Sequence, residues 1–314
     1  MFNRILSAVR KYLKMSKHAL IGGGTGFIGR NLAQHLNQQG YDVTIISRMP
    51  GLRHITWHEL AKNGVPKGVT TVINVAGQNV LDPRSRWTDG FKQNVWKSRI
   101  NSSASLAKAI ESAPEVKSFV NISGVSHYRP SETKVYNEND EVESFDFMSE
   151  LCLAWEKAAT PSAEVEKRCR VIKLRTGVVV GNGGGMIQSI MLPFKLGLGG
   201  PMGTGKQIMP WIHLNDLCRL IQHCVEQQKC VGVLNAVAPE IVTNGEFSKA
   251  FATALHRPCV FAVPEFVVHM LFGKDRSALL LSGAKIEPKR TIESGFQFKY
   301  PTAKIACEQV VRKQ

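Results

Sequence analysis

The spacing of three glycines near the N-terminus constrains this chain more than any other feature. Gly23, Gly26 and Gly29 follow the apolar run at residues 18–21 and precede a helical pattern at residues 31–39. After a strand, this spacing permits a tight turn, close approach of the backbone to a pyrophosphate, and close packing of helix on strand. Free N–H groups at the helix N-terminus attract phosphate. We predict a dinucleotide-binding loop made of Gly23, Gly24, Thr25, Gly26, Phe27, Ile28 and Gly29.

The residues that end the second expected strand, at 42–47, indicate which dinucleotide is bound. Ser47 and Arg48 stand where a site that prefers NAD places Asp or Glu, whose carboxylate accepts hydrogen bonds from a ribose hydroxyl. A guanidinium instead makes charge-assisted bonds to phosphate, and a carboxylate would repel the additional phosphate of NADP. We therefore predict NADP(H) as the cofactor. The alternative is that Arg48 is a solvated strand end.

Strand-like runs alternate with helical patterns over the first 180 residues. The strands are expected at 18–21, 42–47, 54–57, 69–75, 117–122 and within 170–180, and the longest helices at 88–112, 149–159 and 211–227. This alternation predicts an α/β NAD(P)-binding Rossmann fold, a doubly wound parallel sheet with a smaller C-terminal substrate lobe. We expect the Rossmann domain to comprise 17–180 with 211–238, and the lobe 181–210 with 239–314.

Composition favours a soluble enzyme-like protein over a nucleic-acid or metal-binding one. Hydrophobic residues make up 43% of the chain, and no apolar run is long enough to span a bilayer. The net charge of +15 comes from basic residues that are scattered rather than gathered on one motif, so we expect no nucleic-acid partner. None of the seven cysteines has zinc-site spacing, which predicts free thiols and no metal.

The first residues differ from the rest of the chain. Residues 1–17 contain five Lys or Arg residues and no Asp or Glu, and their apolar residues recur at helical spacing. A basic, acid-poor amphipathic segment is typical of a mitochondrial presequence. We predict that residues 1–16 form a basic leader that directs the protein to mitochondria. The alternative is a cytoplasmic protein with an unstructured leader.

Five segments together resemble the extended short-chain dehydrogenase/reductases, and within them an atypical branch known as epimerase family proteins. They lie at 22–29 (GGGTGFIG), 73–80, 174–186, 197–217 (including PWIHLNDL) and 285–301 (ending GFQFKYP). The resemblance implies that the end of the fourth strand lies along the adenosine, that two residues of the next helix approach the cofactor, and that His213 is structural. The implied cofactor contacts are Asn74, Val75, Ala76, Gly77, Asn94 and Arg99.

The catalytic residues that the resemblance implies are only partly present. Related enzymes place a Ser after the fifth strand and a YxxxK pair on the following helix. Ser123 matches that Ser best, and Ser126 is second, but Met148 and Cys152 stand where Tyr and Lys belong. A thioether is not an acid and a thiol carries no positive charge. Tyr128 and His127 are the replacement acid/base candidates.

Three functions remain open from the sequence. The first is an NADP-dependent oxidoreductase acting on a small molecule. The second is an NADP(H)-binding sensor or scaffold without turnover, which the absent Tyr and Lys favour. The third is an epimerase-like isomerase. The resemblance also implies homodimer contacts through the helices expected at 90–112 and 149–160.

Overall fold

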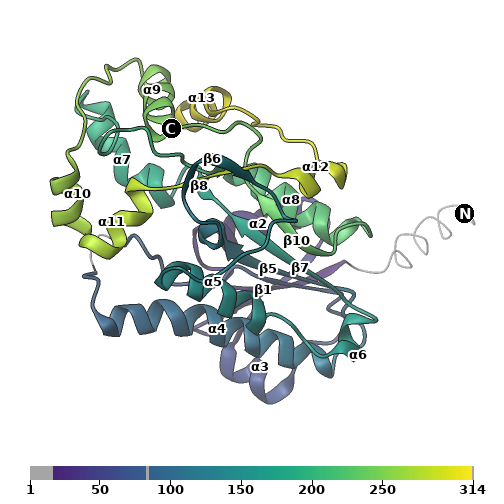
Figure 1. Ribbon diagram of the computed structural model, residues 1–314. Helices are drawn as coiled ribbons and strands as arrows, with labels where there is room; N and C mark the ends of the chain where they lie inside the picture. The colour runs from purple at the N-terminus through teal and green to yellow at the C-terminus, as the bar shows by residue number, and fades with distance from the viewer. Residues whose placement is uncertain (1–16, 83–84, 313–314) are drawn as a thin grey trace, which may run out of the picture.

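The computed structural model describes residues 17–82 and 85–312, and the expected leader at 1–16 lies outside them (Figure 1). A seven-stranded parallel sheet with the order β10-β7-β5-β4-β1-β2-β3 forms its centre. The strands are β1 (His18–Gly22), β2 (Asp42–Ser47), β3 (His54–Thr56), β4 (Thr71–Asn74), β5 (Ser118–Gly124), β7 (Arg170–Thr176) and β10 (Gly232–Ala236). The predicted doubly wound Rossmann-type α/β fold is confirmed.

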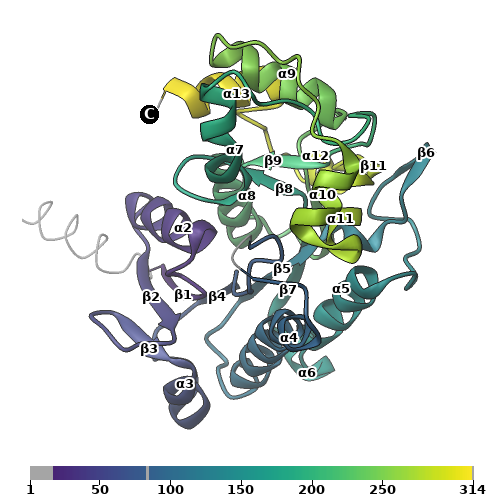
Figure 2. The ribbon, with the colours of Figure 1, turned by 90° about the vertical axis from the view of Figure 1, so that its left-hand side faces the viewer.

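Helices cover both faces of this sheet (Figure 2). One face carries α2 (Phe27–Gln38) and α8 (Leu214–Glu226), whose apolar sides pack on the sheet. The other face carries α3 (Trp57–Asn63), α4 (Asp89–Glu111), α5 (Phe147–Ala158) and α6 (Ala163–Glu166). The inner strands are buried on both faces; for example, every residue of β4 is buried. That pattern is required when helices cover both sides of a parallel sheet.

A second group of elements lies beyond the carboxyl end of the sheet (Figure 1). It contains the helices α7 (Gly185–Lys195), α9 (Asn244–Ala254), α10 (Glu265–Phe272), α11 (Lys274–Leu281) and α13 (Ala303–Arg312), whereas α12 (Lys289–Glu293) packs beside β10 through Arg290 and Thr291. Two short parallel pairs join it: β8 (Val178–Val180) with β9 (Trp211–His213), and β6 (Ser131–Tyr136) with β11 (Ala284–Ile286). Its own core gathers Trp211, Phe247, Phe251 and Phe194.

Three expected elements differ in the structure by more than a shift of one or two residues. The single strand expected within 170–180 is divided at Gly177, because the backbone of Pro210 approaches so closely that a Cβ there would lie 2.7 Å from its carbonyl oxygen. The helix expected at 211–227 begins only at Leu214, since Trp211–His213 pair with β8 and the His213 side chain caps α8 by accepting from Asn215 N. Helix α2 begins at Phe27, earlier than residue 31.

No helix within residues 17–82 and 85–312 combines the length and the apolar character that a membrane span needs.

Candidate active site

The glycine loop joins β1 to α2 with a geometry that its glycines make possible. Gly23 has φ +78°, and a Cβ on it would lie 2.6 Å from Ala76 Cα. A Cβ on Gly29 would lie 2.2 Å from the carbonyl oxygen of Gly23, so α2 packs directly on the turn. Gly26 is different, because a Cβ there would meet the same oxygen at only 3.4 Å. Internal packing therefore requires Gly23 and Gly29, whereas Gly26 leaves the exposed side of the loop open.

That open side borders a cavity of about 440 Å³ that is lined by Gly23, Thr25, Gly26, Ser47, Arg48, Ala76 and Gly77, among others. The predicted loop and the end of β2 are thus brought together. Arg48 is exposed, and no hydrogen bond or ion pair holds its side chain among the described residues. Ser47 is buried and its hydroxyl donates to the Met49 carbonyl. Phe27 and Ile28 lie outside the lining: Phe27 sits against Gly184, and Ile28 packs on the core.

Asn74 shapes the edge of this cavity from within the fold. Its side chain is fully buried and donates from Nδ2 to Ser103 Oγ at 2.9 Å and to Asn121 Oδ1 at 2.8 Å. Its Oδ1 accepts from Ala76 N at 3.2 Å. Asn74 therefore links β4, β5 and α4 and fixes the backbone that leads to Gly77. Val75 and Ala76 line the cavity, and Asn74 does not.

Helix α4 contributes a face to the cavity that the sequence reasoning did not identify. Lys97, Ser98, Asn101, Ser102 and Ser105 line it, at spacings of one, three and four residues that share one side of a helix. Lys97 adds a second cation to the site of Arg48. The spacing was visible in the sequence, but only the packing of α4 shows which face it turns to the loop.

Asn94 and Arg99, the two α4 residues predicted to contact the cofactor, do not line this cavity. Asn94 is exposed and does not line the cavity. Arg99 lies against Gly77, where a Cβ would be 3.2 Å from its Cζ, and its guanidinium stacks on the Trp155 ring at 5.0 Å. Burial lowers the pKa of Arg99 to about 10, and the side chain stays cationic at neutral pH.

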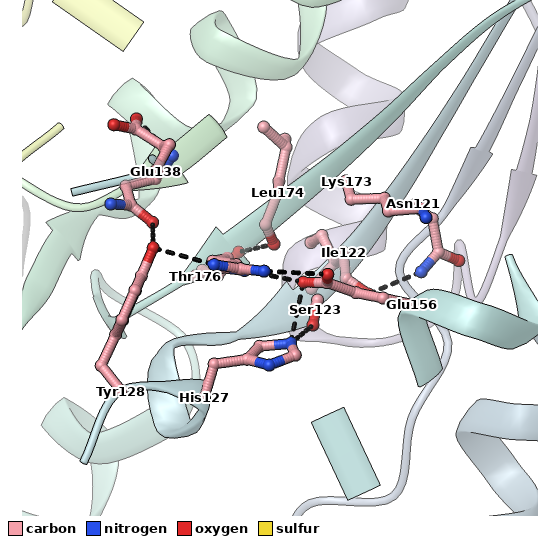
Figure 3. Close-up of polar contacts among 12 residues, drawn as sticks. Asn121, Ile122, Ser123, His127, Tyr128, Glu138, Glu156, Lys173, Leu174 and Thr176 are labelled. Carbon is pink, nitrogen blue, oxygen red and sulfur yellow. Dashed lines mark hydrogen bonds and ion pairs between the residues drawn. The ribbon is translucent and has the colours of Figure 1, made fainter. Parts of the chain in front are cut away.

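The carboxyl end of β5 carries a buried polar network (Figure 3). Ser123 Oγ lies 3.4 Å from His127 Nε2, and the same nitrogen lies 2.8 Å from Glu156 Oε1. Arg175 on β7 donates to both Glu156 oxygens, at 2.9 Å from Nε and 3.1 Å from Nη2. Ser123 and His127 are 2% and 1% exposed. The hydroxyl and the imidazole come from β5 and the turn after it, and the ion pair comes from α5 and β7. The four side chains form one continuous chain of contacts.

The charges in this network are fixed by their mutual contacts. Burial alone would raise the pKa of Glu156, but the hydrogen bonds from His127 and Arg175 outweigh it and lower the pKa to about 2. Conversely, burial would lower the pKa of Arg175, and its bonds to Glu156 raise it. Glu156 is therefore a carboxylate beside the imidazole at any physiological pH.

The network is not a hydrolase triad. In that arrangement the histidine uses one ring nitrogen for the serine and the other for the acid. Here Nε2 faces both Ser123 and Glu156, and Nδ1 has no hydrogen-bond partner among the described residues. The arrangement can instead pass one proton between His127 and Ser123 while Glu156 holds the ring.

Tyr128, one of the two residues predicted for catalysis, faces away from Ser123. Its hydroxyl accepts from Arg175 Nη1 at 3.0 Å and donates to Asn235 Oδ1 at 2.9 Å, and the side chain is 3% exposed. Burial raises the pKa of Tyr128, which keeps the phenol protonated. These contacts link the turn after β5 to β7 and β10, so the geometry favours a structural role for Tyr128 over the expected acid/base role.

Helix α5 carries Met148 and Cys152, which stand where the family resemblance implies Tyr and Lys. Cys152 lies against the end of β5, where a Cβ on Gly124 would be 3.1 Å from its Sγ. It is 1% exposed, and burial raises the pKa of its thiol to about 12. A neutral, buried thiol is neither a nucleophile nor a substitute for a lysine. The Arg99 charge lies near enough to influence it, so a cation is present beside the position that Cys152 occupies.

Sequence reasoning did not identify Arg175, Asn235 or Glu156 as members of this network. An Arg that follows the apolar Leu174 in a strand expected to lie inside the sheet was the available signal for Arg175, since a buried guanidinium requires an acidic partner.

Comparisons with known proteins agree with this fold. Residues 19–236 match the model of the NAD dependent epimerase/dehydratase family, and residues 263–310 match a domain of unknown function. The human epimerase family protein SDR39U1 is 43% identical over 293 residues, which cover 93% of this chain and 99% of the human protein. An epimerase family protein of Staphylococcus saprophyticus is 33% identical, covering 94% of this chain and 99% of the relative.

Solved structures give the same result. A crystal structure of human SDR39U1 (isoform 2) with NADPH matches with a TM-score of 0.92 at 43% identity, covering 95% of this chain and 100% of that one. UDP-glucose 4-epimerase from Thermotoga maritima matches with a TM-score of 0.71 at 15% identity, over 94% of this chain and 98% of its own, which shows a shared fold. This chain therefore belongs to the NAD dependent epimerase/dehydratase family.

Proposed function

We propose that this protein is an NADP(H)-dependent oxidoreductase that interconverts a carbonyl and an alcohol on a small molecule. The observation that carries the proposal is the position of two sites on neighbouring strands. The glycine-loop cavity lies at the carboxyl ends of β1 and β4, and the Ser123–His127–Glu156 network lies at the carboxyl end of β5. Ligands of open α/β sheets bind at this edge.

The cavity fits a phosphorylated dinucleotide. Gly26 leaves backbone N–H groups at the start of α2 accessible to a pyrophosphate, and no acidic residue lines the cavity among the described residues. Arg48 and Lys97 are two cations that can hold a ribose phosphate, which carries close to two negative charges. The NADPH-bound structure of the human relative supports this assignment. NADPH, when bound, supplies the hydride that a carbonyl reduction needs.

The chain's own residues supply a proton without the usual Tyr and Lys. In the proposed reduction, the Ser123 hydroxyl donates its hydrogen to the carbonyl oxygen, and the His127 Nε2 proton replaces it. Glu156 holds the imidazole in place through its 2.8 Å contact with Nε2, while Arg175 keeps that carboxylate ionised. Arg99 provides the positive charge that Cys152 cannot provide. General acid catalysis of this kind contributes about 10²–10⁴-fold.

A non-catalytic role as an NADP(H) sensor is the second candidate, and one observation favours it. Met148 and Cys152 occupy the positions of the usual acid/base pair, and the Cys152 thiol is neutral and buried.

One experiment separates the two functions. The purified full chain is titrated with NADPH by calorimetry and then screened for NADPH oxidation with aldehydes, ketones and quinones. For any substrate found, Ser123→Ala and His127→Gln should lower kcat by about 10²-fold or more, with NADPH affinity unchanged. Conservative Ser123→Thr should retain part of the activity. Binding of NADPH without turnover of any compound class would favour the sensor. Absence of NADPH binding would refute both.

We further propose that the basic segment at residues 1–16 directs the protein to mitochondria. Its basic, acid-free composition supports the proposal. Residues 1–20 fused to a fluorescent reporter should localise the reporter to mitochondria. A matched fusion in which Arg4, Arg10, Lys11 and Lys14 are replaced by Gln should stay cytosolic. A diffuse signal from the unaltered fusion would contradict the proposal.

A further inference from the structure

The end of α7 and the chain that leads into α10 carry an exposed apolar surface. Leu196 and Leu198 are 64% and 60% exposed, and Val260 and Phe261 are 73% and 56% exposed. With Leu192, Phe266, Met270 and Leu271, they make up more than half of the large hydrophobic side chains that are exposed within residues 17–82 and 85–312. We call these eight residues the apolar patch. Single exposed hydrophobic residues are ordinary, whereas a concentration of them indicates an interaction site.

The two segments of the apolar patch lie side by side. Arg257 Nε donates to the Lys195 carbonyl at 2.8 Å, and a Cβ on Gly197 would lie 3.5 Å from Pro258 Cγ. The backbone of Gly200 touches the Phe261 carbonyl. Figures 1 and 2 both show α7 and α10 on the same side of the molecule. At 195–200 and 257–261 the patch is therefore formed by two adjoining segments that are about sixty residues apart in the chain, and α10 follows the second of them directly.

Positive charge borders the patch. Lys195, Lys249 and Arg257 are exposed, and none of them forms an ion pair with an acid among the described residues. Lys249 and Arg257 line a shallow cavity of about 400 Å³ together with the neighbouring Cys259. Within 192–198 and 257–272, Glu265 is the single acidic residue. The surface thus pairs exposed hydrophobic side chains with a pocket that suits an anionic group.

We propose that the apolar patch docks this protein onto an anionic phospholipid bilayer. Lys249 and Arg257 contact the phosphates of the head groups, and Leu196, Leu198, Val260 and Phe261 enter the boundary between head groups and acyl chains. Interfacial proteins combine these two attractions. A symmetric contact between two copies would instead enclose more positive than negative charge, because Lys195, Lys249 and Arg257 border the patch and Glu265 is the single acid within 192–198 and 257–272. The net charge of +15 further favours a negative surface.

The test uses the full chain and vesicles of phosphatidylcholine, with or without about one-third phosphatidylserine. Two variants alter the patch: Leu196→Ser/Leu198→Ser, and Lys195→Gln/Lys249→Gln. Two controls make the same changes on exposed residues far from it. Leu52→Ser removes a 93% exposed leucine between β2 and β3, and Lys62→Gln/Lys67→Gln removes two exposed cations in and after α3. Since all these side chains are exposed, the thermal unfolding midpoint should stay unchanged.

We expect flotation with the anionic vesicles and little with the neutral ones. The leucine variant should reduce vesicle affinity by about tenfold or more, and the lysine variant by a similar factor that shrinks in high salt. Both controls should bind like the unaltered protein. Hydrogen exchange should show vesicle-dependent protection at 192–198 and 257–272.

Three results would overturn the proposal. The first is the absence of binding to anionic vesicles. The second is binding that neither patch variant weakens, with protection confined to other segments such as residues 1–16. The third is a dimer, seen by light scattering without vesicles, that the leucine variant converts to monomer, because a second copy would then occupy the patch.

Discussion

The ion pair between Glu156 and Arg175 should contribute strongly to the free energy of unfolding, because it joins α5 to β7 inside the fold. Its size can be tested quantitatively. The two side chains are 11% and 6% exposed, and Arg175 donates to both carboxylate oxygens. Arg175→Met keeps the length of the side chain and removes its charge. It leaves a buried carboxylate with His127 as its remaining partner. Removal of one partner from a buried pair costs about 3–5 kcal/mol, and we expect a loss in this range at pH 7.

The pKa of Glu156 gives an independent magnitude. It is lowered from 4.5 to about 2, and one pH unit corresponds to about 1.4 kcal/mol, so the native contacts stabilise the carboxylate by roughly 3 kcal/mol. Because the pKa is lowered in the folded state, this stability is present above about pH 5 and is lost as the pH falls toward 2. Glu156→Gln should remove this part of the acid sensitivity.

The assay is urea unfolding followed by tryptophan fluorescence, at pH 7 and at pH 4. Lys167→Met serves as the control, because it breaks an ion pair with Glu164 that is exposed on the surface and is worth less than about 1 kcal/mol. The double variant Arg175→Met/Glu156→Gln should recover part of the lost stability, since it no longer buries an unpaired charge. A loss below about 1 kcal/mol for Arg175→Met, equal to the control, would refute the reasoning.

Other predictions concern the cofactor loop and the helix α5. Arg48→Asp should weaken NADPH binding in calorimetry by more than about tenfold and NADH binding far less, because it replaces a phosphate-binding cation with an anion; equal losses would contradict the NADP assignment. Gly29→Ala should abolish NADPH binding or folding, since its Cβ would lie 2.2 Å from the Gly23 carbonyl oxygen. Gly90→Ala, in α4, is its control and should be neutral or stabilising, because its Cβ meets a neighbour only at 4.0 Å. Cys152 should resist alkylation by iodoacetamide at pH 8 in the native protein and react after unfolding, as followed by mass spectrometry, because burial raises its pKa to about 12; rapid native labelling would show a reactive thiol. Light scattering should report a homodimer that Trp96→Glu, on α4, converts to monomer, whereas a monomeric unaltered protein would contradict the expected contact through α4 and α5.

Local sequence determined the fold class and the phosphate loop. Glycine spacing, alternating apolar runs and the residues at the end of β2 act over short stretches of chain, and each stretch carries its own structural preference. The strand bounds at 42–47 needed no tertiary information, because an apolar run bounded by turn residues specifies them. The boundary between β9 and α8 did need tertiary information, because Trp211–His213 form a strand only by pairing with β8. The division into a Rossmann domain and a substrate lobe stays a prediction.

Tertiary structure alone decided which polar side chains meet. Ser123, Glu156 and Arg175 come from three different elements, and no local pattern indicates that Glu156 faces both His127 and Arg175. It also directed the Tyr128 hydroxyl to Asn235 and away from Ser123, and turned Lys97 rather than Asn94 toward the cavity. The physical reason is that the rotation of a helix and the direction of a side chain depend on packing against distant segments. The sequence by itself determined that a dinucleotide loop is present, and packing determined which groups stand beside it.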